Sequence, residues 1–145
     1  MNRLIVDMIK KSVTEFNQWR KDNPGEHIDL WKADLSKVNM KGINLDYAYM
    51  RECNLENALL DGSSFKRAML EDSNLKYASL SNCKLIQADM SGANLHRANL
   101  ENSDLSLADL RQADLTEADM TSAIMKSTDT SDADMRWAKM DKIEW

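Results

Sequence analysis

A large apolar side chain returns at every fifth position of this sequence, from Leu30 to Trp145. Of these 24 positions, which we call centres, 14 are Leu, seven are Met and one is Phe65, while Thr130 is polar. The residue two places before each centre is usually small, and 14 of these positions are Ala. A core built on this pattern must accommodate one large and one small side chain in each repeat.

A period of five residues excludes a continuous helix and a flat strand. On an α-helix a step of five turns the chain by about 500°, so successive centres drift by roughly 140° and share no face. On a strand an odd step sends successive centres to opposite faces. The chain must therefore turn a corner in every repeat. The centre and the residue two before it point inward, the residue between them points outward, and the next two residues form the turn.

Repeated corners of this kind predict a solenoid. If each corner is close to 90°, four repeats close a square, and the chain rises by one strand spacing of about 4.8 Å. Residues 26–145 then form about six coils in a rod under roughly 30 Å long. The spacing alone also permits a three-sided coil.

Several repeats share one consensus, namely ADLSK, ANLHR, ANLEN, ADLRQ and ADLTE. With these repeats the chain resembles the pentapeptide repeat proteins, whose unit is roughly Ala-Asp/Asn-Leu-X-X. The resemblance covers about five-sixths of the chain. It implies an all-β solenoid, a right-handed four-sided (quadrilateral) parallel β-helix, and this hand is also expected for parallel crossovers. We therefore expect a β-helix over 26–145 and an α-helical cap with its turn over 1–25.

The residue before the centre is Asp or Asn in 15 of the 24 repeats. Such short polar side chains can bond nearby backbone and support the turns. One column of positions spaced by 20 residues is wholly Asp or Asn, and we expect it to form a structural ladder. Its members are Asp34, Asn54, Asn74, Asn94, Asp114 and Asp134.

The segment before the repeats predicts one amphipathic helix that runs to about Asp22, where the sequence DNPG ends it. This helix is expected to cover the open edge of the first coil. Asp7 and Glu15 disfavour the alternative of a helix on a membrane surface. The apolar stripe that forms the predicted cap consists of Ile5, Met8, Ile9, Val13, Phe16 and Trp19.

No corresponding cover is predicted at the other end, where Trp137, Met140 and Trp145 lie in the last coil. Two interpretations are open. Charged side chains such as Lys139 and Asp141 could protect the edge alone, or two molecules could stack end to end and bury Trp145. We expect a homodimer through this end.

Catalytic chemistry is not expected. His27 and His96 lie on different parts of the predicted rod, and no Ser or Cys stands in a nucleophile context. The four glycines form no phosphate-binding loop. Cys53 and Cys83 occupy small inward positions and are expected to be inert thiols, which favours a reducing, cytoplasmic setting. No run of 18 apolar residues exists that would predict a membrane span.

A cation site is the alternative interpretation of three stacked carboxylates, Asp89, Asp109 and Asp129. Their mutual repulsion could be relieved by Ca²⁺. The glycine-rich loops of calcium-binding β-rolls are absent, however, and Arg111 and Arg136 lie nearby. We expect these to be solvated side chains that bond the backbone, with no metal and no cofactor.

The charge pattern bears on partners. Residues 1–84 carry 13 basic and 12 acidic side chains, whereas residues 85–145 carry six basic and 12 acidic ones. The net charge of −5 argues against direct nucleic-acid binding. An outward apolar set, Ile86, Leu107 and Ile124, shares one predicted face and is the candidate protein-contact patch.

These features predict a non-catalytic, rod-shaped scaffold that acts through protein contacts on its outer faces. The partner itself is not encoded in any motif. The alternative comes from the resemblance: some pentapeptide repeat proteins mimic duplex DNA and bind type II topoisomerases such as DNA gyrase. The acidic C-terminal part fits that alternative, while the modest net charge and the lack of outward loops disfavour it.

Overall fold

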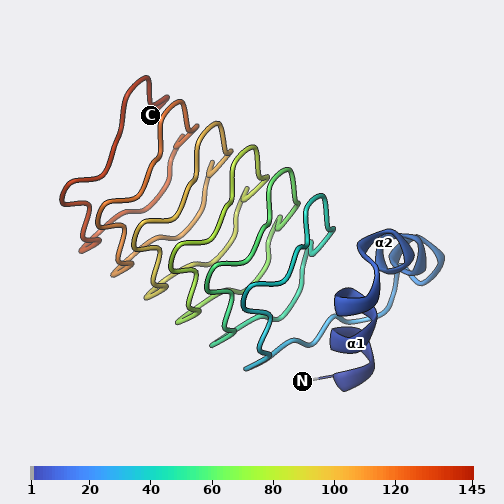
Figure 1. The fold of residues 1–145 in the computed structure, drawn as a ribbon. Helices are drawn as coiled ribbons and strands as arrows, with labels where there is room; N and C mark the ends of the chain where they lie inside the picture. Colours follow the sequence, from blue (N-terminus) through green and yellow to red (C-terminus); the bar gives the residue numbers. More distant parts are fainter. Residues whose placement is uncertain (1) are drawn as a thin grey trace.

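The computed structural model describes residues 2–145. Two short helices, α1 (Arg3–Lys11) and α2 (Val13–Asp22), lie at one end of a regular coil formed by the rest of the chain (Figure 1). Parallel β-bridges join each residue that precedes a centre to the residue 20 positions later, from Asp29–Tyr49 to Ile124–Glu144. One turn of the coil therefore takes four pentapeptides. The β structure of residues 2–145 consists of these single bridges, without longer strands.

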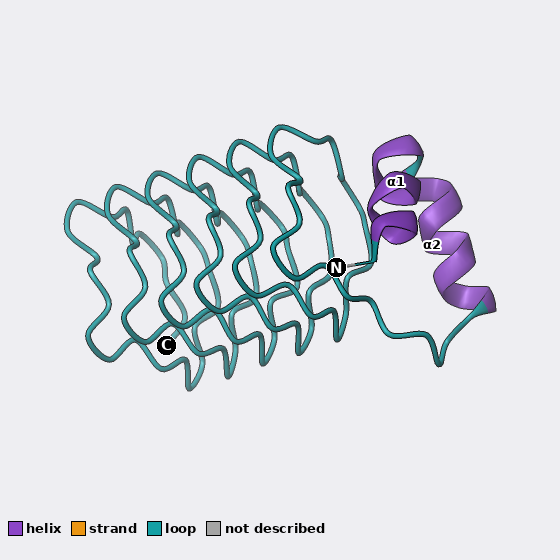
Figure 2. Ribbon diagram, turned by 90° about the horizontal axis from the view of Figure 1, so that it is seen from below, coloured by secondary structure: helices purple, strands orange, loops and turns teal. Residues whose placement is uncertain are grey.

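The four pentapeptides of each coil define four walls, which stack along the axis (Figure 2). Wall 1 contains Leu30 and every twentieth residue after it, and walls 2, 3 and 4 begin in the same way at Leu35, Met40 and Leu45. Each wall includes the residue before its centre, and we call the two residues after the centre its corner. Corner 4, for example, begins with Asp46 and Tyr47.

Backbone hydrogen bonds produce the bend that the sequence predicts. The N–H of Leu30 donates to the carbonyl of Tyr49 in the next coil (2.8 Å), and the N–H of Tyr49 donates back to Ile28 (2.8 Å). Within the turn the N–H of Ala33 donates to the carbonyl of Leu30 at 2.9 Å. Because this set recurs along the coil, the chain forms a ladder and a corner in every repeat.

The second corner residue has a left-handed backbone throughout, from Lys32 (φ 56°) to Lys142 (φ 58°). Gly42, Gly62 and Gly92 fill three of these positions, and all the remaining ones carry a side chain. A left-handed conformation costs a non-glycine residue about 1–2 kcal/mol. The packing of the lumen and the ladder bonds must offset that cost at each corner.

The lumen is filled as the period predicts. Leu95, Leu100, Leu105 and Leu110 lie on four successive walls and each is fully buried, at 0% exposure. The small residues two places before the buried centres are also buried, and most of them are alanines. The few that are serine or cysteine donate hydrogen bonds to carbonyls, as Ser63 does to Met40 at 3.1 Å. This pattern confirms the predicted assignment of inward positions.

The N-terminal segment differs from the single helix that the sequence predicted, because the helix breaks at Ser12. Ser12 is extended (φ −163°) and its hydroxyl accepts the N–H of Glu15, which starts α2. The break lets two short helices lie at different angles across the end of the coil (Figure 1). Of the predicted stripe, Ile5, Ile9 and Phe16 are buried, while Met8, Val13 and Trp19 are half-buried against the core.

Polar groups of this segment pair with the exposed edge of the first coil. The N–H of Asn2 donates to the carbonyl of Asp29 at 2.8 Å. The Asn17 amide donates to the carbonyl of Gly42 and accepts the N–H of Asn44, both at 2.9 Å, so it acts like one peptide group of a missing coil. These bonds satisfy groups that would otherwise invite pairing with another chain. Neither described helix has the length and apolar character needed to cross a bilayer.

Candidate functional site

Because centres and small residues fill the lumen, the groups that can meet another molecule lie on the walls, the corners and the two ends. The predicted patch lies on one side of the coil: Ile86 and Leu107 are in corner 4 and Ile124 is on wall 4. Leu107 is 56% exposed, whereas Ile86 and Ile124 are half-buried. The N–H of Gln87 donates to the carbonyl of Ser106 (3.0 Å), which places Leu107 one coil above Ile86.

Polar residues separate the members of this patch. Ile124 stacks between Asp104 and Glu144, and Glu144 pairs with Lys126 at 3.1 Å. The three apolar side chains are therefore separated from one another by polar and charged side chains. They do not form a closed apolar cluster of their own.

Reading the sequence in columns of 20 shows that charge is distributed by wall. Wall 1 with its corner carries eight acidic and three basic residues, a net charge of −5, whereas wall 4 with its corner carries three acidic and four basic residues. This distribution by wall adds to the excess of acidic residues in the C-terminal part of the chain. The acidic residues of wall 1 and its corner are Asp29, Glu52, Glu71, Asp72, Asp89, Asp109, Asp129 and Asp132.

Ion pairs climb the other three sides of the coil. On corners 1, 2 and 3, basic residues pair with acids 20 positions later, as in Lys32–Glu52 (3.2 Å) and Lys41–Asp61 (2.9 Å). The pairs Arg51–Glu71 and Arg97–Glu117 follow the same rule at 3.5 and 2.7 Å. With the pairs that Arg111, Arg136 and Lys139 form, these contacts neutralise seven of the ten cations on those sides. The other three, Lys37, Lys76 and Lys142, form no ion pair within residues 2–145.

On corner 4 and wall 4 the last cation, Lys126, pairs with Glu144, whereas Lys66, Arg67 and Lys84 form no ion pair within residues 2–145. Arg67 donates from Nε to the amide oxygen of Gln87 at 2.8 Å. Its guanidinium carbon also lies 5.9 Å from the centre of the Tyr47 ring. The side chains of Tyr47, Arg67 and Gln87 thus form a ladder up the corner, with Leu107 one coil above.

The lower end of this ladder meets a groove beside α2. Two adjoining hollows of about 370 and 260 Å³ share four lining residues, Arg20, Pro24, Asp46 and Tyr47. The Tyr47 ring is 63% exposed there. The Asp46 carboxylate faces the next coil, because it accepts the hydroxyl of Ser64 at 2.5 Å and the N–H of Lys66 at 2.9 Å.

Arg20 is a half-buried cation in that groove. It donates from Nη2 to the carbonyl of Asp46 (2.9 Å) and forms no ion pair within residues 2–145. Burial lowers the pKa of Arg20, and the charge of Asp46 only partly opposes this. The guanidinium is thus partly desolvated without a full counter-charge.

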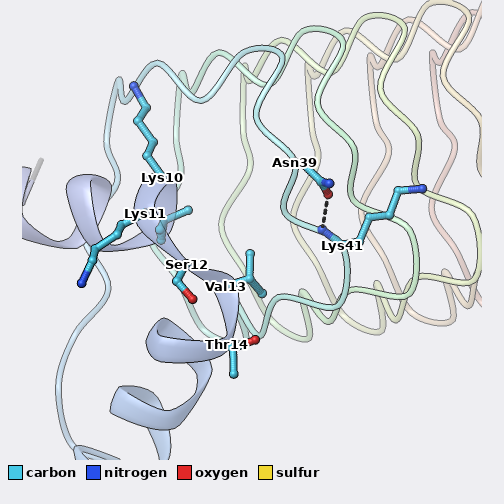
Figure 3. A pocket seen from close by; sticks show the side chains of 8 residues that line it. Lys10, Lys11, Ser12, Val13, Thr14, Asn39 and Lys41 are labelled. Atoms are coloured by element: carbon cyan, nitrogen blue, oxygen red, sulfur yellow. Dashed lines mark hydrogen bonds between the residues drawn. The ribbon is translucent and has the colours of Figure 1, made fainter.

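A third hollow, of about 340 Å³, lies where α1 meets α2, and three lysines are among the residues that line it (Figure 3). Lys11 pairs with Glu15 and Lys41 with Asp61, both at 2.9 Å, which leaves Lys10 without an ion pair inside residues 2–145. Two of its three cations are therefore already neutralised.

The stacked carboxylates bond the protein itself. The guanidinium of Arg111 makes a fork on Asp109 (2.6–3.0 Å), and the same hydrogen bonding lowers the pKa of Asp109. Asp89 and Asp129 each accept the backbone N–H and the hydroxyl of the serine two residues later. No group of three potential metal ligands gathers anywhere in residues 2–145. The Asx column supports turns in the same way, but its amide-to-side-chain ladder joins only Asp34, Asn54 and Asn74.

The cysteines and histidines lie apart. Cys53 and Cys83 are buried, and burial raises the pKa of each thiol to about 12. His96 bonds Thr116 through Nδ1 at 2.7 Å on corner 2, whereas His27 lies in the linker beside α2. The structure brings none of these residues together into a nucleophile–base pair.

The last coil, residues 126–145, is not covered, within the described chain, on the side that faces away from the helices. Trp137, Met140 and Trp145 are 75%, 41% and 66% exposed. The N–H groups of Met135, Trp137 and Met140 find no backbone acceptor within residues 2–145. This end therefore offers both apolar side chains and unpaired backbone donors.

Comparison with known proteins identifies the repeats. The family described as Pentapeptide repeats matches with eight copies, over residues 26–62, 39–76, 48–87, 73–112 and 103–141. No curated protein sequence is significantly similar to the chain.

Solved structures agree with the family match. The chain is similar to Rfr23, a pentapeptide repeat protein from the cyanobacterium Cyanothece 51142, with 21% identity, a TM-score of 0.74, and coverage of 92% of this chain and 99% of that one. A pentapeptide repeat protein from the Arabidopsis thaliana thylakoid lumen has 28% identity and a TM-score of 0.51, covering 72% and 63% of the two chains. The pentapeptide repeat protein alr5209 from Nostoc Pcc 7120 has 34% identity and a TM-score of 0.54, covering 60% and 69%.

Proposed function

The chain belongs to the pentapeptide repeat family, and from that premise we propose that it is a non-catalytic scaffold that binds another protein through its outer surface. The observation that supports this most is the filled lumen, in which every centre from Leu30 to Met125 is at most 1% exposed. A regular coil of this kind uses its inward side chains for packing. Recognition then falls to side chains that point outward.

The contact surface that we propose is the side of the coil with Ile86, Leu107 and Ile124. Apolar side chains on a surface are typical of protein contacts when they lie among polar neighbours. Leu107 is the most exposed of the three, and it occupies a left-handed corner position where glycine would be easier (φ 60°). Since most of these positions carry polar side chains, it is the apolar and exposed character of Leu107 that favours a contact role.

Retention of a partner from the native cell tests this proposal. The triple variant Ile86→Ser/Leu107→Ser/Ile124→Ser should lose a protein that the unchanged chain retains. The matched control, Leu59→Ser/Met69→Ser/Tyr77→Ser, removes apolar residues of 39–41% exposure from the other three sides and should retain it. Equal retention by the two variants, with unchanged thermal unfolding, would contradict the proposed surface.

We further propose that the uncovered side of the coil 126–145 associates with a second copy of the chain. Exposed Met140 and Trp145 and the unpaired donors beside them support this, since a sheet edge binds another edge through its free N–H and C=O groups. Light scattering of the 145-residue chain should give twice the protomer mass of 16.6 kDa. Met140→Glu/Trp145→Glu should give a monomer, whereas Trp31→Glu at the other end should not. A monomer of the unchanged chain at high concentration would refute the dimer.

A second candidate is a protein that mimics DNA and binds a type II topoisomerase. The net charge of −5 on wall 1 and its corner favours it, since Asp89, Asp109 and Asp129 repeat there once per coil. A DNA gyrase supercoiling assay with excess protein tests this candidate. Asp89→Asn/Asp129→Asn should weaken any effect, and Asp114→Asn/Asp134→Asn on wall 2 serves as the control. If the protein neither inhibits nor protects gyrase, this candidate is ruled out.

A further inference from the structure

We propose that corner 4, together with the groove beside α2, binds an extended acidic segment of a partner protein. This inference rests on the proposed scaffold function, and it names the chemistry of the partner. We call this surface the corner-4 strip. It consists of Arg20, Lys21, Asp46, Tyr47, Lys66, Arg67, Lys84, Ile86, Gln87 and Leu107.

The first argument is the charge of the strip. It holds five basic residues and one acidic residue, and Glu26 is a second acid that lines the groove, in a chain whose net charge is −5. Its five cations form no ion pair within residues 2–145, whereas seven of the ten cations on walls and corners 1, 2 and 3 are paired. The acidic residue, Asp46, already accepts two hydrogen bonds from the next coil. The strip therefore lacks counter-charges that a partner can supply.

The second argument is the spacing of the ladder. Tyr47, Arg67, Gln87 and Leu107 are successive residues of one column, held in register by backbone bonds such as Tyr47 N–H to Lys66 (2.8 Å). Three steps of about 4.8 Å give a length of ~14 Å. An extended peptide rises by ~3.3 Å per residue, so four or five residues span it. A peptide along the strip would meet a cationic middle between an aromatic and an aliphatic end.

The third argument is the groove at the lower end. There the half-buried guanidinium of Arg20 uses one donor, on the carbonyl of Asp46 (2.9 Å), and has others left. A carboxylate in the groove would gain a charge-assisted bond from a partly desolvated cation, which is stronger than a bond to a fully hydrated one. The exposed Tyr47 ring and Pro24 line the same hollows. An acidic residue next to an apolar one fits this end.

The composition of the strip favours a peptide over a nucleic acid. Single-stranded nucleic acids are held by successive aromatic side chains on which bases stack. The strip has one aromatic residue, Tyr47, while Ile86 and Leu107 present aliphatic surface. Acidic walls on the rest of the coil would also repel a long phosphate backbone.

Fluorescence anisotropy tests the inference with a defined probe, the fluorescein-labelled octapeptide Glu-Glu-Phe-Glu-Asp-Leu-Glu-Gly, at about 50 mM NaCl, where screening is weak. We expect saturable binding that Lys66→Glu/Arg67→Glu weakens by at least ~tenfold. The matched control is Lys76→Glu/Lys37→Glu, which changes the same two corner positions on corner 2 and the net charge by the same amount. It should weaken binding by less than about twofold. Tyr47→Ala should also weaken binding, and Tyr77→Ala, an exposed tyrosine at the same position of corner 2, should not.

Three results would overturn the inference: no saturable binding, equal losses in the two charge-reversal variants, or tighter binding of a single-stranded oligonucleotide than of the octapeptide. These outcomes are separable from failure of the scaffold proposal. A partner that the unchanged chain retains and the Ile86/Leu107/Ile124 variant loses would uphold the scaffold even if the octapeptide does not bind. If no partner is retained by the unchanged chain and the octapeptide does not bind, both proposals are refuted.

Discussion

The pair Leu105 and Leu107 offers the sharpest test of the coil register, because the same residue type stands twice on one side of the molecule. Leu105 is a centre of wall 4 with 0% exposure, and Leu107 is its second corner residue with 56% exposure. Leu105→Ala would leave a void between Leu85 and Met125, which stack below and above it. The surrounding backbone bonds both neighbouring coils and cannot close around the void.

The magnitudes follow from this difference. Buried Leu→Ala changes cost about 2–5 kcal/mol, and the cost rises with the volume that stays empty, so we expect ~4 kcal/mol at Leu105. Leu107→Ala removes side-chain carbons that are mostly in water, at about 0.8 kcal/mol per fully buried carbon, and leaves no void, so we expect below ~1 kcal/mol. Both changes keep a non-glycine residue, so the left-handed cost at position 107 cancels.

Urea unfolding at 25 °C, followed by far-UV circular dichroism, gives both free energies of unfolding. An Arg pair extends the test: Leu105→Arg should unfold the chain, because it buries an unpaired charge, and Leu107→Arg should not. Losses at 105 and 107 that agree within about 1 kcal/mol would refute the inward and outward assignment on which the fold rests.

Three further outcomes follow from single sites. Burial acts to raise the pKa of Asp61, but bonds from Ser79, Lys41 and Ser81 outweigh it and lower that pKa to about 2. Since the unfolded value is about 3.9, the stabilisation is present above pH ~4 and is lost as the pH falls to ~2. Asp61→Asn should thus cost ~1 kcal/mol at pH 7 and nothing below about pH 2 in acid titrations of stability. Ser122→Gly should raise the free energy of unfolding by ~0.5 kcal/mol, because Ser122 is left-handed (φ 59°). Thr121→Gly, one position earlier, should lower the free energy of unfolding. The thiols of Cys53 and Cys83, with pKa values of about 12, should react with a disulfide reagent at pH 8 only as fast as the chain unfolds.

The coil could be predicted because one physical requirement repeats in every pentapeptide. Leu95, Leu100, Leu105 and Leu110 share no face on any regular element, so burying all four forces the backbone to bend between them. The five-residue period therefore predicts a coil, whereas the four sides were expected from the resemblance to the pentapeptide repeat proteins. The same assignment of inward and outward positions predicts that both cysteines are buried and that the aspartates before the centres support turns.

The break between α1 and α2 was missed, although the sequence held a signal for it. Ser12 and Glu15 have the spacing of a capping box, and the Ser12 hydroxyl accepts the Glu15 N–H at 3.2 Å. The apolar stripe misled the prediction, because Ile9 and Phe16 are seven residues apart and keep the same helical phase across the break. Periodicity reports the face of a helix and not its continuity.

Only part of the corner-4 strip could be predicted from the sequence. Once the coil takes 20 residues, the column Tyr47, Arg67, Gln87 and Leu107 can be read from the numbering, as can the acidic excess of wall 1. The groove cannot be read in this way. Its position depends on how Arg20 on α2 reaches the carbonyl of Asp46, a contact between segments 26 residues apart that no repeat rule governs.

Because the lumen repeats every five residues and the surface every 20, insertions can separate the fold from the site. One extra pentapeptide after residue 75 keeps every later centre inward but moves it by one wall, so Ile86 and Leu107 leave the column above Tyr47 and Arg67. We expect that insertion to leave a folded coil that binds the acidic octapeptide more weakly, but with a smaller loss than Lys66→Glu/Arg67→Glu causes, because Lys66 and Arg67 stay in place. The same insertion after residue 115 lies above the strip and should leave binding unchanged. If both insertions bind alike, Ile86, Gln87 and Leu107 contribute nothing to recognition of the octapeptide. If only the insertion after residue 75 unfolds the chain, the coil depends on contacts between particular walls more than on the five-residue period.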